Sequence, residues 1–230
     1  MKNKSIKDEK MVKLCIFDLD GTVLDTIHTI AYYGNYALKR HGVAPIDTDA
    51  YKYLVGTGMA NLVKKMLLYR DCYTDELFEK VLFDYNNAYN SNVRYKTEKF
   101  PGLTEILDKL KALGYKLAIV SNKPDYPTRV VVSSIYGDNY FDYVTGKREE
   151  LPLKPDPTVV FDVMGRFGAS PENCIYIGDT ATDMHTGKNA KLYTVGVLWG
   201  FRGEKELSEG GADAIVSTPE ELLCAITERK

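Results

Sequence analysis

Two aspartates, Asp18 and Asp20, follow a short apolar run near the start of the 230-residue chain. Because side chains of an extended segment alternate between its two faces, both carboxylates face the same way while Leu19 turns toward the core. Attack by one carboxylate on phosphorus gives an aspartyl-phosphate, which divides a difficult displacement into two easier steps. The other carboxylate is placed to protonate the departing oxygen and later to deprotonate the attacking water. The pair predicts phosphoryl transfer with Asp18 as the nucleophile and Asp20 as the general acid/base.

Further polar side chains stand at the ends of later apolar runs, or just before the helical stretch that precedes one of them. They comprise a hydroxyl, an amide, a lysine and two carboxylates: Ser121, Asn122, Lys154, Asp179 and Asp183. In an open parallel sheet, ligands bind beyond the carboxyl ends of the strands. We therefore expect these groups to converge with the two aspartates of the first run at one edge of a sheet.

Carboxylates gathered this closely repel one another and raise one another's pKa unless a cation lies between them. A hard divalent ion, Mg²⁺, prefers oxygen ligands and usually keeps waters and a substrate phosphate as well. The metal and Lys154 would together offset the charge of a phosphoryl group in the transition state. Ser121, which we expect at the start of a helix, would offer its hydroxyl and nearby backbone N–H groups to the phosphate. We predict that Ser121, Asn122 and Lys154 bind the phosphate, although Ser121 could instead be only the N-cap of that helix.

Short apolar runs alternate with longer helical patterns, which is typical of an α/β fold with a parallel sheet. Strands are expected at 12–17, 116–120, 174–177 and 193–197, with weaker ones at 141–144 and 214–216. Helical spacing covers 103–113, 128–136 and 157–167. Gly114 stands where a glycine is expected after the end of a helix.

The stretch 27–96 differs because its apolar residues recur at helical spacing and no strand-like run interrupts them. It separates the first two expected strands and is far longer than an ordinary crossover connection. We interpret it as an inserted all-helical domain, with 11–26 and 97–230 forming the α/β domain and 1–10 a disordered polar tail. The insert holds ten of the seventeen tyrosines, and we expect them to pack its helices with their hydroxyls reaching solvent.

Composition limits the classes of function. The formal net charge is −2 and the basic residues are spread along the chain, which argues against a dedicated nucleic-acid or anionic-membrane binder. No apolar stretch approaches the length of a membrane span, and the N-terminus does not read as a secretory signal. The four cysteines share no metal-type spacing. A reducing compartment suits this pattern, so we expect a cytoplasmic protein without nucleic-acid or membrane partners.

On these residues the chain resembles the haloacid dehalogenase (HAD) superfamily over nearly its whole length. Four motifs occur in order: Asp-Leu-Asp-Gly-Thr at 18–22, then Ser121, Lys154, and Gly178-Asp179 with Asp183. The resemblance implies a Rossmann-like parallel sheet with helices on both faces, and it identifies 27–96 as a cap that closes over the site and selects the substrate. It also implies Mg²⁺ held by the Asp18 and Asp179 carboxylates and the Asp20 backbone carbonyl, with Asp183 orienting metal-bound water.

Within the superfamily the chain is most similar to phosphoglycolate phosphatase-like members. The segments 20–25, 196–202 and 211–216 carry this similarity. It implies hydrolysis of a small phosphorylated metabolite, and we expect a monomer or a homodimer. One departure is Lys191, which follows Ala190 where relatives usually have glycine. It affects only the local geometry of a turn beside a helix end.

Several alternatives share parts of this pattern. A phosphosugar mutase of the β-phosphoglucomutase kind has the same catalytic core, but its members typically carry a Gly-x-Ser-Arg signature in the cap, and the matching stretch 56–60 lacks the arginine. A pyrophosphatase or a nucleotide phosphatase stays open. Dehalogenase chemistry does without a second aspartate such as Asp20. A phospho-signalling receiver domain is far shorter and lacks the inserted cap.

A few single residues complete the predictions. Asp179 could be a simple helix N-cap instead of a metal ligand. Arg202 is a candidate anion contact in the loop after the fourth expected strand. His28, His41 and His185 have no partner pattern, and we assign them no catalytic role.

Overall fold

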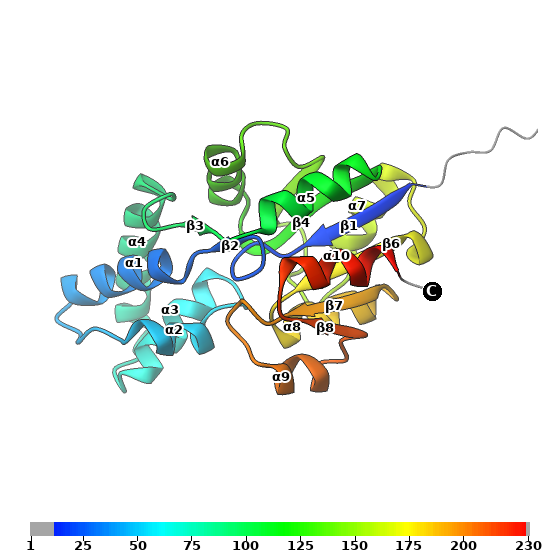
Figure 1. Ribbon diagram of the computed structural model, residues 1–230. Helices are drawn as coiled ribbons and strands as arrows, with labels where there is room; N and C mark the ends of the chain where they lie inside the picture. The colour runs from blue at the N-terminus through cyan, green and yellow to red at the C-terminus, as the bar shows by residue number, and fades with distance from the viewer. Residues whose placement is uncertain (1–11, 229–230) are drawn as a thin grey trace, which may run out of the picture.

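Six parallel strands form the central sheet of the protein (Figure 1). In the computed structural model, which describes residues 12–228, the strand order is β5-β4-β1-β6-β7-β8. The inner strand β1 is a continuous apolar run because a parallel sheet is covered on both faces. The strands are β1 (Lys13–Phe17), β4 (Tyr115–Pro124), β5 (Tyr143–Lys147), β6 (Cys174–Gly178), β7 (Tyr193–Val197) and β8 (Ala214–Val216).

The register of the sheet aligns β1, β4 and β6 near their carboxyl ends. Phe17 in β1 pairs with Ile119 in β4 and with Ile177 in β6, and β4 continues beyond this level to Pro124. The backbone N–H of Asp18 donates to the Ile177 carbonyl at 2.9 Å, so Asp18 begins where the neighbouring strand β6 ends. Every polar residue that follows these three strands therefore starts from the same edge of the sheet.

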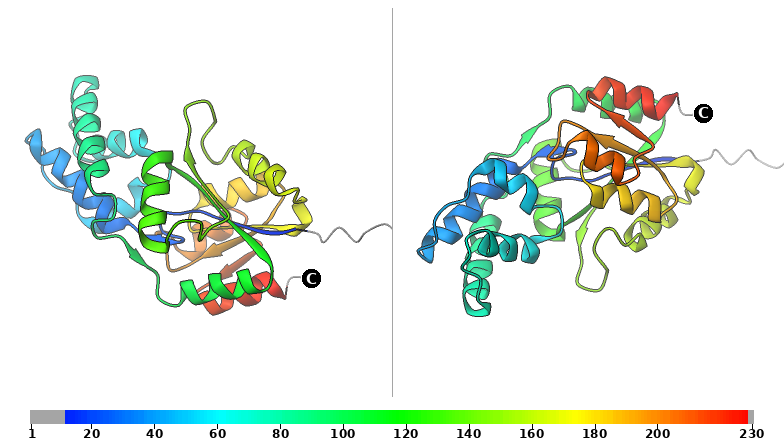
Figure 2. Two further views of the ribbon diagram at one scale, coloured as in Figure 1. Left: turned by 90° about the horizontal axis from the view of Figure 1, so that it is seen from above. Right: turned by 90° about the horizontal axis from the view of Figure 1, so that it is seen from below.

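Alternate residues of β1 supply the two faces of the sheet. Cys15 and Phe17 belong to a large buried cluster that includes residues of α5, α6 and α10, whereas Leu14 and Ile16 belong to a second cluster with α7. Views from above and below show helices on both sides of the sheet (Figure 2), which confirms the predicted fold class. The helices of this part are α5 (Leu103–Ala112), α6 (Asp125–Tyr136), α7 (Thr158–Phe167), α8 (Ala181–Asn189), α9 (Glu204–Glu209) and α10 (Pro219–Thr227), with a short 3₁₀ turn, η1 (Pro171–Asn173).

Four helices follow one another between β1 and β4 and gather at the carboxyl edge of the sheet (Figure 1). Two short strands flank them, and these pair antiparallel, with Leu24 opposite Lys99 and Asp25 opposite Glu98. The chain thus enters and leaves the helical group through one small ladder, an element that the sequence analysis missed. The elements are β2 (Leu24–Asp25), α1 (Ile27–Arg40), α2 (Thr48–Leu54), α3 (Met59–Tyr69), α4 (Asp75–Ser91) and β3 (Glu98–Lys99).

This ladder lies just outside the stretch 27–96, which supports our proposal that 27–96 is a separate insert between 11–26 and 97–230. We call the helical group α1–α4 the cap. Its helices are joined near the ladder by side-chain hydrogen bonds: the Thr29 hydroxyl lies 2.8 Å from that of Thr97, and the Tyr33 hydroxyl donates to the Asn92 carbonyl at 2.9 Å. The tail predicted for 1–10 lies outside the described residues.

One local prediction about the chain after β4 is wrong. The strand was expected to end at 120 and the following helix to begin near 128, but β4 continues to Pro124 and α6 begins at Asp125. The residue before a proline is driven to the extended region, so Lys123 keeps the chain extended up to Pro124. Ser121 therefore lies within a strand, and it is neither at the start of a helix nor an N-cap. Strand β5 is likewise displaced from 141–144 to Tyr143–Lys147.

Among the described residues, no helix has both the length and the apolar character that crossing a membrane would require.

Lys191 occupies a backbone conformation that glycine adopts more readily. Its φ of 61° is left-handed, where a side chain meets the following carbonyl. We expect Lys191→Gly to raise the free energy of unfolding by about 1 kcal/mol, because relief of this clash exceeds the added entropy of the unfolded chain. Urea unfolding monitored by circular dichroism measures the change. As a control, Lys39→Gly at an exposed position in α1 should lower stability by about 1 kcal/mol. Equal losses in both variants would contradict this account.

Candidate active site

Asp18 and Asp20 leave β1 into a tight turn closed by backbone hydrogen bonds. The N–H of Gly21 donates to the Leu24 carbonyl at 2.9 Å. Gly21 has a φ of 93°, and a Cβ at this position would overlap the carboxylate of Asp179. Glycine is therefore required on two grounds, since only it combines this backbone angle with so close an approach of a carboxylate.

Lys154 lies between two buried carboxylates. Its Nζ donates to Asp18 Oδ1 at 2.6 Å and to Asp183 Oδ1 at 2.7 Å, and all three side chains are at least nine-tenths buried. Burial alone would favour the neutral amine, but the two carboxylates raise the pKa of Lys154 well above its usual range. Lys154 is therefore a fixed positive charge next to the residue predicted to attack.

Three carboxylates, those of Asp18, Asp179 and Asp183, offer oxygens that all lie within 4.8 Å of one another. Burial raises the pKa of Asp18 to about 7, with repulsion from Asp183 adding to the rise and Lys154 opposing it. Burial also raises the pKa of Asp179 well above its usual range, and both neighbouring carboxylates contribute. A cluster of oxygen ligands whose charges are destabilised in this way fits a hard divalent cation, which would stabilise their ionised forms.

Asp179 and Asp183 are each fixed by hydrogen bonds. Asp179 accepts from the Thr22 hydroxyl at 3.0 Å and from the backbone N–H of Phe201 at 2.8 Å. Asp183 Oδ2 accepts from the N–H and the hydroxyl of Thr180, at 3.1 and 2.7 Å, in a capping box at the start of α8. The N-cap is thus Thr180, so the alternative that Asp179 merely caps this helix is wrong.

Asn122 joins the cap to Lys154. Its side-chain amide donates to the carbonyls of Gly56 and Lys154, at 3.0 and 3.2 Å, and its Oδ1 accepts from the Lys154 N–H at 2.9 Å. The side chain of Asn122 is therefore engaged in positioning Lys154. Ser121 is buried and lines the same cavity as Asp18, and its Oγ accepts from the backbone N–H of Lys123 at 3.2 Å. Phosphate binding by Ser121, Asn122 and Lys154 stays a prediction.

Lys123 is a site residue that the sequence analysis missed. Its Nζ donates to Asp20 Oδ1 at 2.8 Å, and its side chain is only 5% exposed. The same ammonium lies 4.7 Å from the ring centroid of Tyr89 in the cap. Ser121, Asn122 and Lys123 all line the cavity and the register of β4 is irregular between Val120 and Pro124, so simple alternation along a strand would not have identified Lys123.

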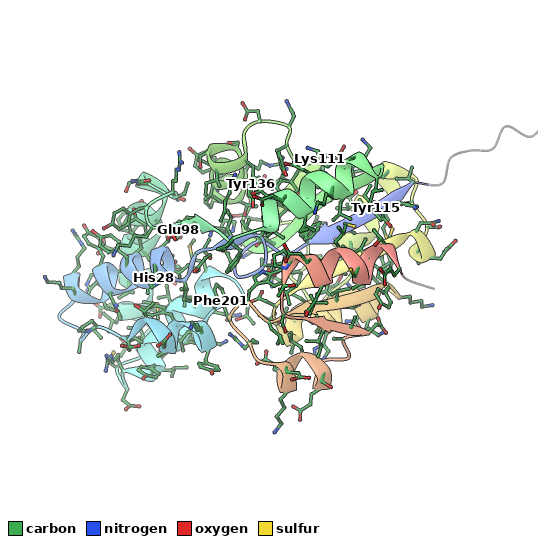
Figure 3. All side chains as sticks on the ribbon, in the orientation of Figure 1. His28, Glu98, Lys111, Tyr115, Tyr136 and Phe201 are labelled. Atoms are coloured by element: carbon green, nitrogen blue, oxygen red, sulfur yellow. The ribbon has the colours of Figure 1, made fainter. Side chains whose placement is uncertain are left out.

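A cavity of about 60 Å³ lies between the cap and the carboxyl edge of the sheet. All five residues predicted to be catalytic or phosphate-binding line it together with residues of α1, α3 and α4: Asp18, Asp20, Ser121, Asn122 and Lys154. Phe201, labelled in Figure 3, lies at the border between the cap and the sheet and also lines the cavity. The predicted site residues are thus brought together where the four motifs converge, with the cap as the opposite wall.

The tyrosines of the cap do not all behave as predicted. Tyr85 and Tyr89 are buried and line the cavity, and the Tyr89 hydroxyl has no hydrogen-bond partner among the described residues. Others, such as Tyr53 and Tyr69, are exposed as expected. Sequence spacing placed Tyr85 on an apolar helix face but did not show that this face turns toward the two aspartates of β1.

Arg202 and the histidines serve other contacts. The Arg202 guanidinium donates to the backbone carbonyls of Lys52 and Val55 in the cap and pairs with Glu206 at 3.0 Å. Arg202 therefore connects the cap to the loop after β7. These contacts do not support the prediction that Arg202 binds an anion. His41 pairs with Asp84 at 2.8 Å, whereas His28 and His185 are exposed.

Comparison with known proteins gives a consistent result. The family model described as "Haloacid dehalogenase-like hydrolase" matches residues 15–197. A phosphoglycolate phosphatase from Aquifex aeolicus is 30% identical over 212 residues, which cover 92% of this chain and 95% of that protein. One from Nitrosospira multiformis is 30% identical over 207 residues, covering 89% and 91%. A crystal structure from Lactobacillus delbrueckii subsp. bulgaricus matches with a TM-score of 0.89 at 30% identity, covering 94% of this chain and 98% of that one.

The raised pKa of Asp18 makes the stability of the metal-free protein depend on pH. Between the unfolded pKa near 3.9 and the folded pKa of about 7, the folded state holds a proton that the unfolded state has lost. The contribution of Asp18 to the free energy of unfolding therefore falls as pH rises through this window. We expect Asp18→Asn to gain stability relative to the wild type from about pH 4 to about pH 7, measured by urea unfolding in EDTA.

Added Mg²⁺ should stabilise the wild type more at about pH 8 than at about pH 5, because its ligands bind metal in their ionised form. The stabilisation should be smaller in Asp18→Asn. Parallel pH curves for the two metal-free proteins would contradict the assignment of a buried, proton-binding carboxylate at Asp18.

Proposed function

The chain belongs to the haloacid dehalogenase-like hydrolase family, and on that premise we propose that it is a phosphatase acting on a small phosphomonoester through an aspartyl-phosphate at Asp18. The observation that carries the proposal is the buried arrangement of Lys154 between Asp18 and Asp183, with Asp179 completing the carboxylate cluster. This arrangement supports the proposed roles of Asp18 as nucleophile, Lys154 as a fixed cation and the three carboxylates as ligands of a divalent metal.

The metal in our proposal is Mg²⁺, held by the carboxylates of Asp18 and Asp179 and the backbone carbonyl of Asp20, and it would supply positive charge beside the phosphoryl oxygens. Asp183 is fixed by Thr180 and Lys154, which suits the predicted role of orienting a metal-bound water. Lys154 counteracts the effect of burial on Asp18, so it favours the ionised form that attacks.

The proposed reaction takes two displacements. In the first, a carboxylate oxygen of Asp18 bonds to phosphorus as the bond from phosphorus to the ester oxygen breaks, and Asp20 gives its proton to the departing oxygen. In the second, the Asp20 carboxylate takes a proton from a water whose oxygen attacks the same phosphorus. The Asp18 carboxylate then leaves and inorganic phosphate is released.

Lys123 serves in this proposal as a positioning residue for Asp20. Its ammonium holds one carboxylate oxygen at 2.8 Å, while its stem is fixed by burial between β4 and the cap. The acid/base is thus held in place by a residue on the adjacent strand. We also propose a cytoplasmic location, because the spacing of the four cysteines matches no metal site and suits a reducing compartment.

Loss of the nucleophile tests the reaction type. We expect hydrolysis of p-nitrophenyl phosphate in Mg²⁺ to be abolished by EDTA and reduced at least about 10³-fold by Asp18→Asn, because no covalent intermediate can then form. Asp138→Asn, an exposed position outside the site, is the control and should retain full activity. Turnover that survives EDTA or Asp18→Asn would refute the proposal.

The intermediate itself is expected in Asp20→Asn. Nitrophenolate leaves without protonation, so the first step continues while water attack is slowed. Rapid mixing should therefore show a burst of about one nitrophenolate per active site, and peptide mass spectrometry should locate the phosphoryl group on Asp18. Steady turnover without a burst, or a label on another residue, would contradict an aspartyl-phosphate at this position.

Replacement of Lys123 separates positioning from binding. We expect Lys123→Met to lower the single-turnover rate of the first step, transfer of the phosphoryl group to Asp18, about 10–100-fold on an alkyl phosphate, but less on p-nitrophenyl phosphate, whose departing oxygen needs no proton. Lys123→Arg should restore part of the loss, and the exposed Lys147→Met should change neither substrate. An equal loss on both substrates, or a change confined to KM, would show that Lys123 does not act through Asp20.

A further inference from the structure

The wall of the cavity that faces the catalytic edge of the sheet is uncharged. Its side chains come from α1, α3 and α4 and from the residue that follows α2: Ile30, Val55, Met59, Leu62, Tyr85 and Tyr89. Among the described residues that line the cavity, the carboxylates are those of Asp18, Asp20 and Asp183, and they lie on the opposite wall. A substrate whose phosphoryl group lies against Asp18 must therefore direct the rest of its structure toward an apolar and phenolic surface.

The positively charged side chains that line the cavity already form ion pairs with carboxylates of the protein. Among the described residues that line it, the cations are Lys123 and Lys154. Lys154 is shared by Asp18 and Asp183 at 2.6 and 2.7 Å, and Lys123 is held by Asp20 at 2.8 Å. A carboxylate on the substrate could reach Lys123 only by competing with Asp20, and two carboxylates at one ammonium repel each other.

Arg202 is not a substitute for these lysines. It does not belong to the cavity wall, and its guanidinium is engaged by two backbone carbonyls of the cap and by Glu206. The wall does offer neutral hydrogen-bonding groups, and one of them is the phenol of Tyr89. Tyr89 is 1% exposed, and its hydroxyl has no partner among the residues that the structure describes. A buried hydroxyl left unpaired costs free energy, so a substrate oxygen that accepts from it would be favoured.

We propose that the alcohol released from the substrate is uncharged and largely apolar, with a hydroxyl-type or ether-type oxygen for Tyr89, and that a carboxylate at this position is selected against. This inference rests on the proposed phosphatase function and concerns the substrate class of the same site. It separates the chain from the substrate that the names of its relatives indicate, since glycolate carries a carboxylate one carbon from the ester oxygen. The physical reason is that a carboxylate transferred from water to this wall finds only neutral groups and no free cation, among the described residues that line it, to replace its hydration.

A matched pair of substrates isolates the charge. Phosphoglycolate and its amide, 2-phosphoglycolamide, have nearly the same shape and differ in that the amide carries no negative charge. We expect kcat/KM in Mg²⁺ to be at least about tenfold higher for the amide, because the ionised group is penalised on transfer to the cavity wall. A second pair, benzyl phosphate and ethyl phosphate, tests the apolar wall, and benzyl phosphate should be the better substrate.

A cation introduced into the wall should reverse the preference. Met59 is half-buried at the start of α3 and lines the cavity, whereas Ala60 beside it is exposed and does not line it. We expect Met59→Arg to raise the ratio of phosphoglycolate to phosphoglycolamide turnover by about tenfold or more, because its guanidinium would pair with the carboxylate. Ala60→Arg adds the same charge outside the cavity and should leave the ratio unchanged.

The outcomes distinguish this inference from the function on which it rests. If phosphoglycolate is hydrolysed as well as the amide or better, the inference is overturned while the phosphatase function stands. If Ala60→Arg shifts the ratio as much as Met59→Arg, the general charge of the cap and not the wall of the cavity controls selection, and the inference is again overturned. If none of the four esters is hydrolysed, the proposed function fails, and the inference fails with it.

Discussion

The buried ammonium of Lys154 stabilises the carboxylates that gather at the carboxyl edge of the sheet. Asp18, Asp179 and Asp183 crowd within 4.8 Å of one another, and without a cation their ionised forms would repel strongly in a site that water hardly reaches. Lys154 bonds to two of them at once, and its own backbone is fixed by Asn122 on the neighbouring strand. Removing one partner of such a buried group leaves an uncompensated charge, so the carboxylate cluster, including Asp183 of the α8 capping box, depends on this contact.

Sequence patterns predicted the elements of the sheet and the convergence of its polar residues, because both follow from local rules. A continuous apolar run identifies β1, and parallel strands bring the residues after their carboxyl ends to one edge. The prediction failed where the outcome depends on a neighbour distant in sequence. The contact of Lys123 with Asp20 spans 103 positions, and the pairing of β2 with β3 involves two residues on each strand. The inward orientation of Tyr85 required knowledge of how α4 packs over the sheet, which helical spacing alone does not contain.

The two walls of the cavity differ in their chemistry. On the sheet side, charged groups are buried and fixed by reciprocal hydrogen bonds, an arrangement suited to stabilising the charge that develops on a phosphoryl group. On the cap side, apolar and phenolic side chains remove water and recognise shape. Asn122 connects the two walls, since one amide touches the backbone of both Gly56 and Lys154. Docking of the cap and the position of Lys154 are therefore coupled through one side chain.

The small ladder formed by β2 and β3 has a consequence for the history of the chain. Because Asp25 lies opposite Glu98, the two points at which the chain departs from the sheet and returns to it are neighbours in space. The intervening helices could be lengthened, shortened or exchanged for another fold without moving any strand of the sheet, since the connection needs only two adjacent ends. The reaction chemistry, which depends on residues at the strand ends, and the substrate selectivity, which depends on the insert, can thus diverge at separate rates. Sequence identity over the whole chain is therefore a better guide to the reaction than to the substrate.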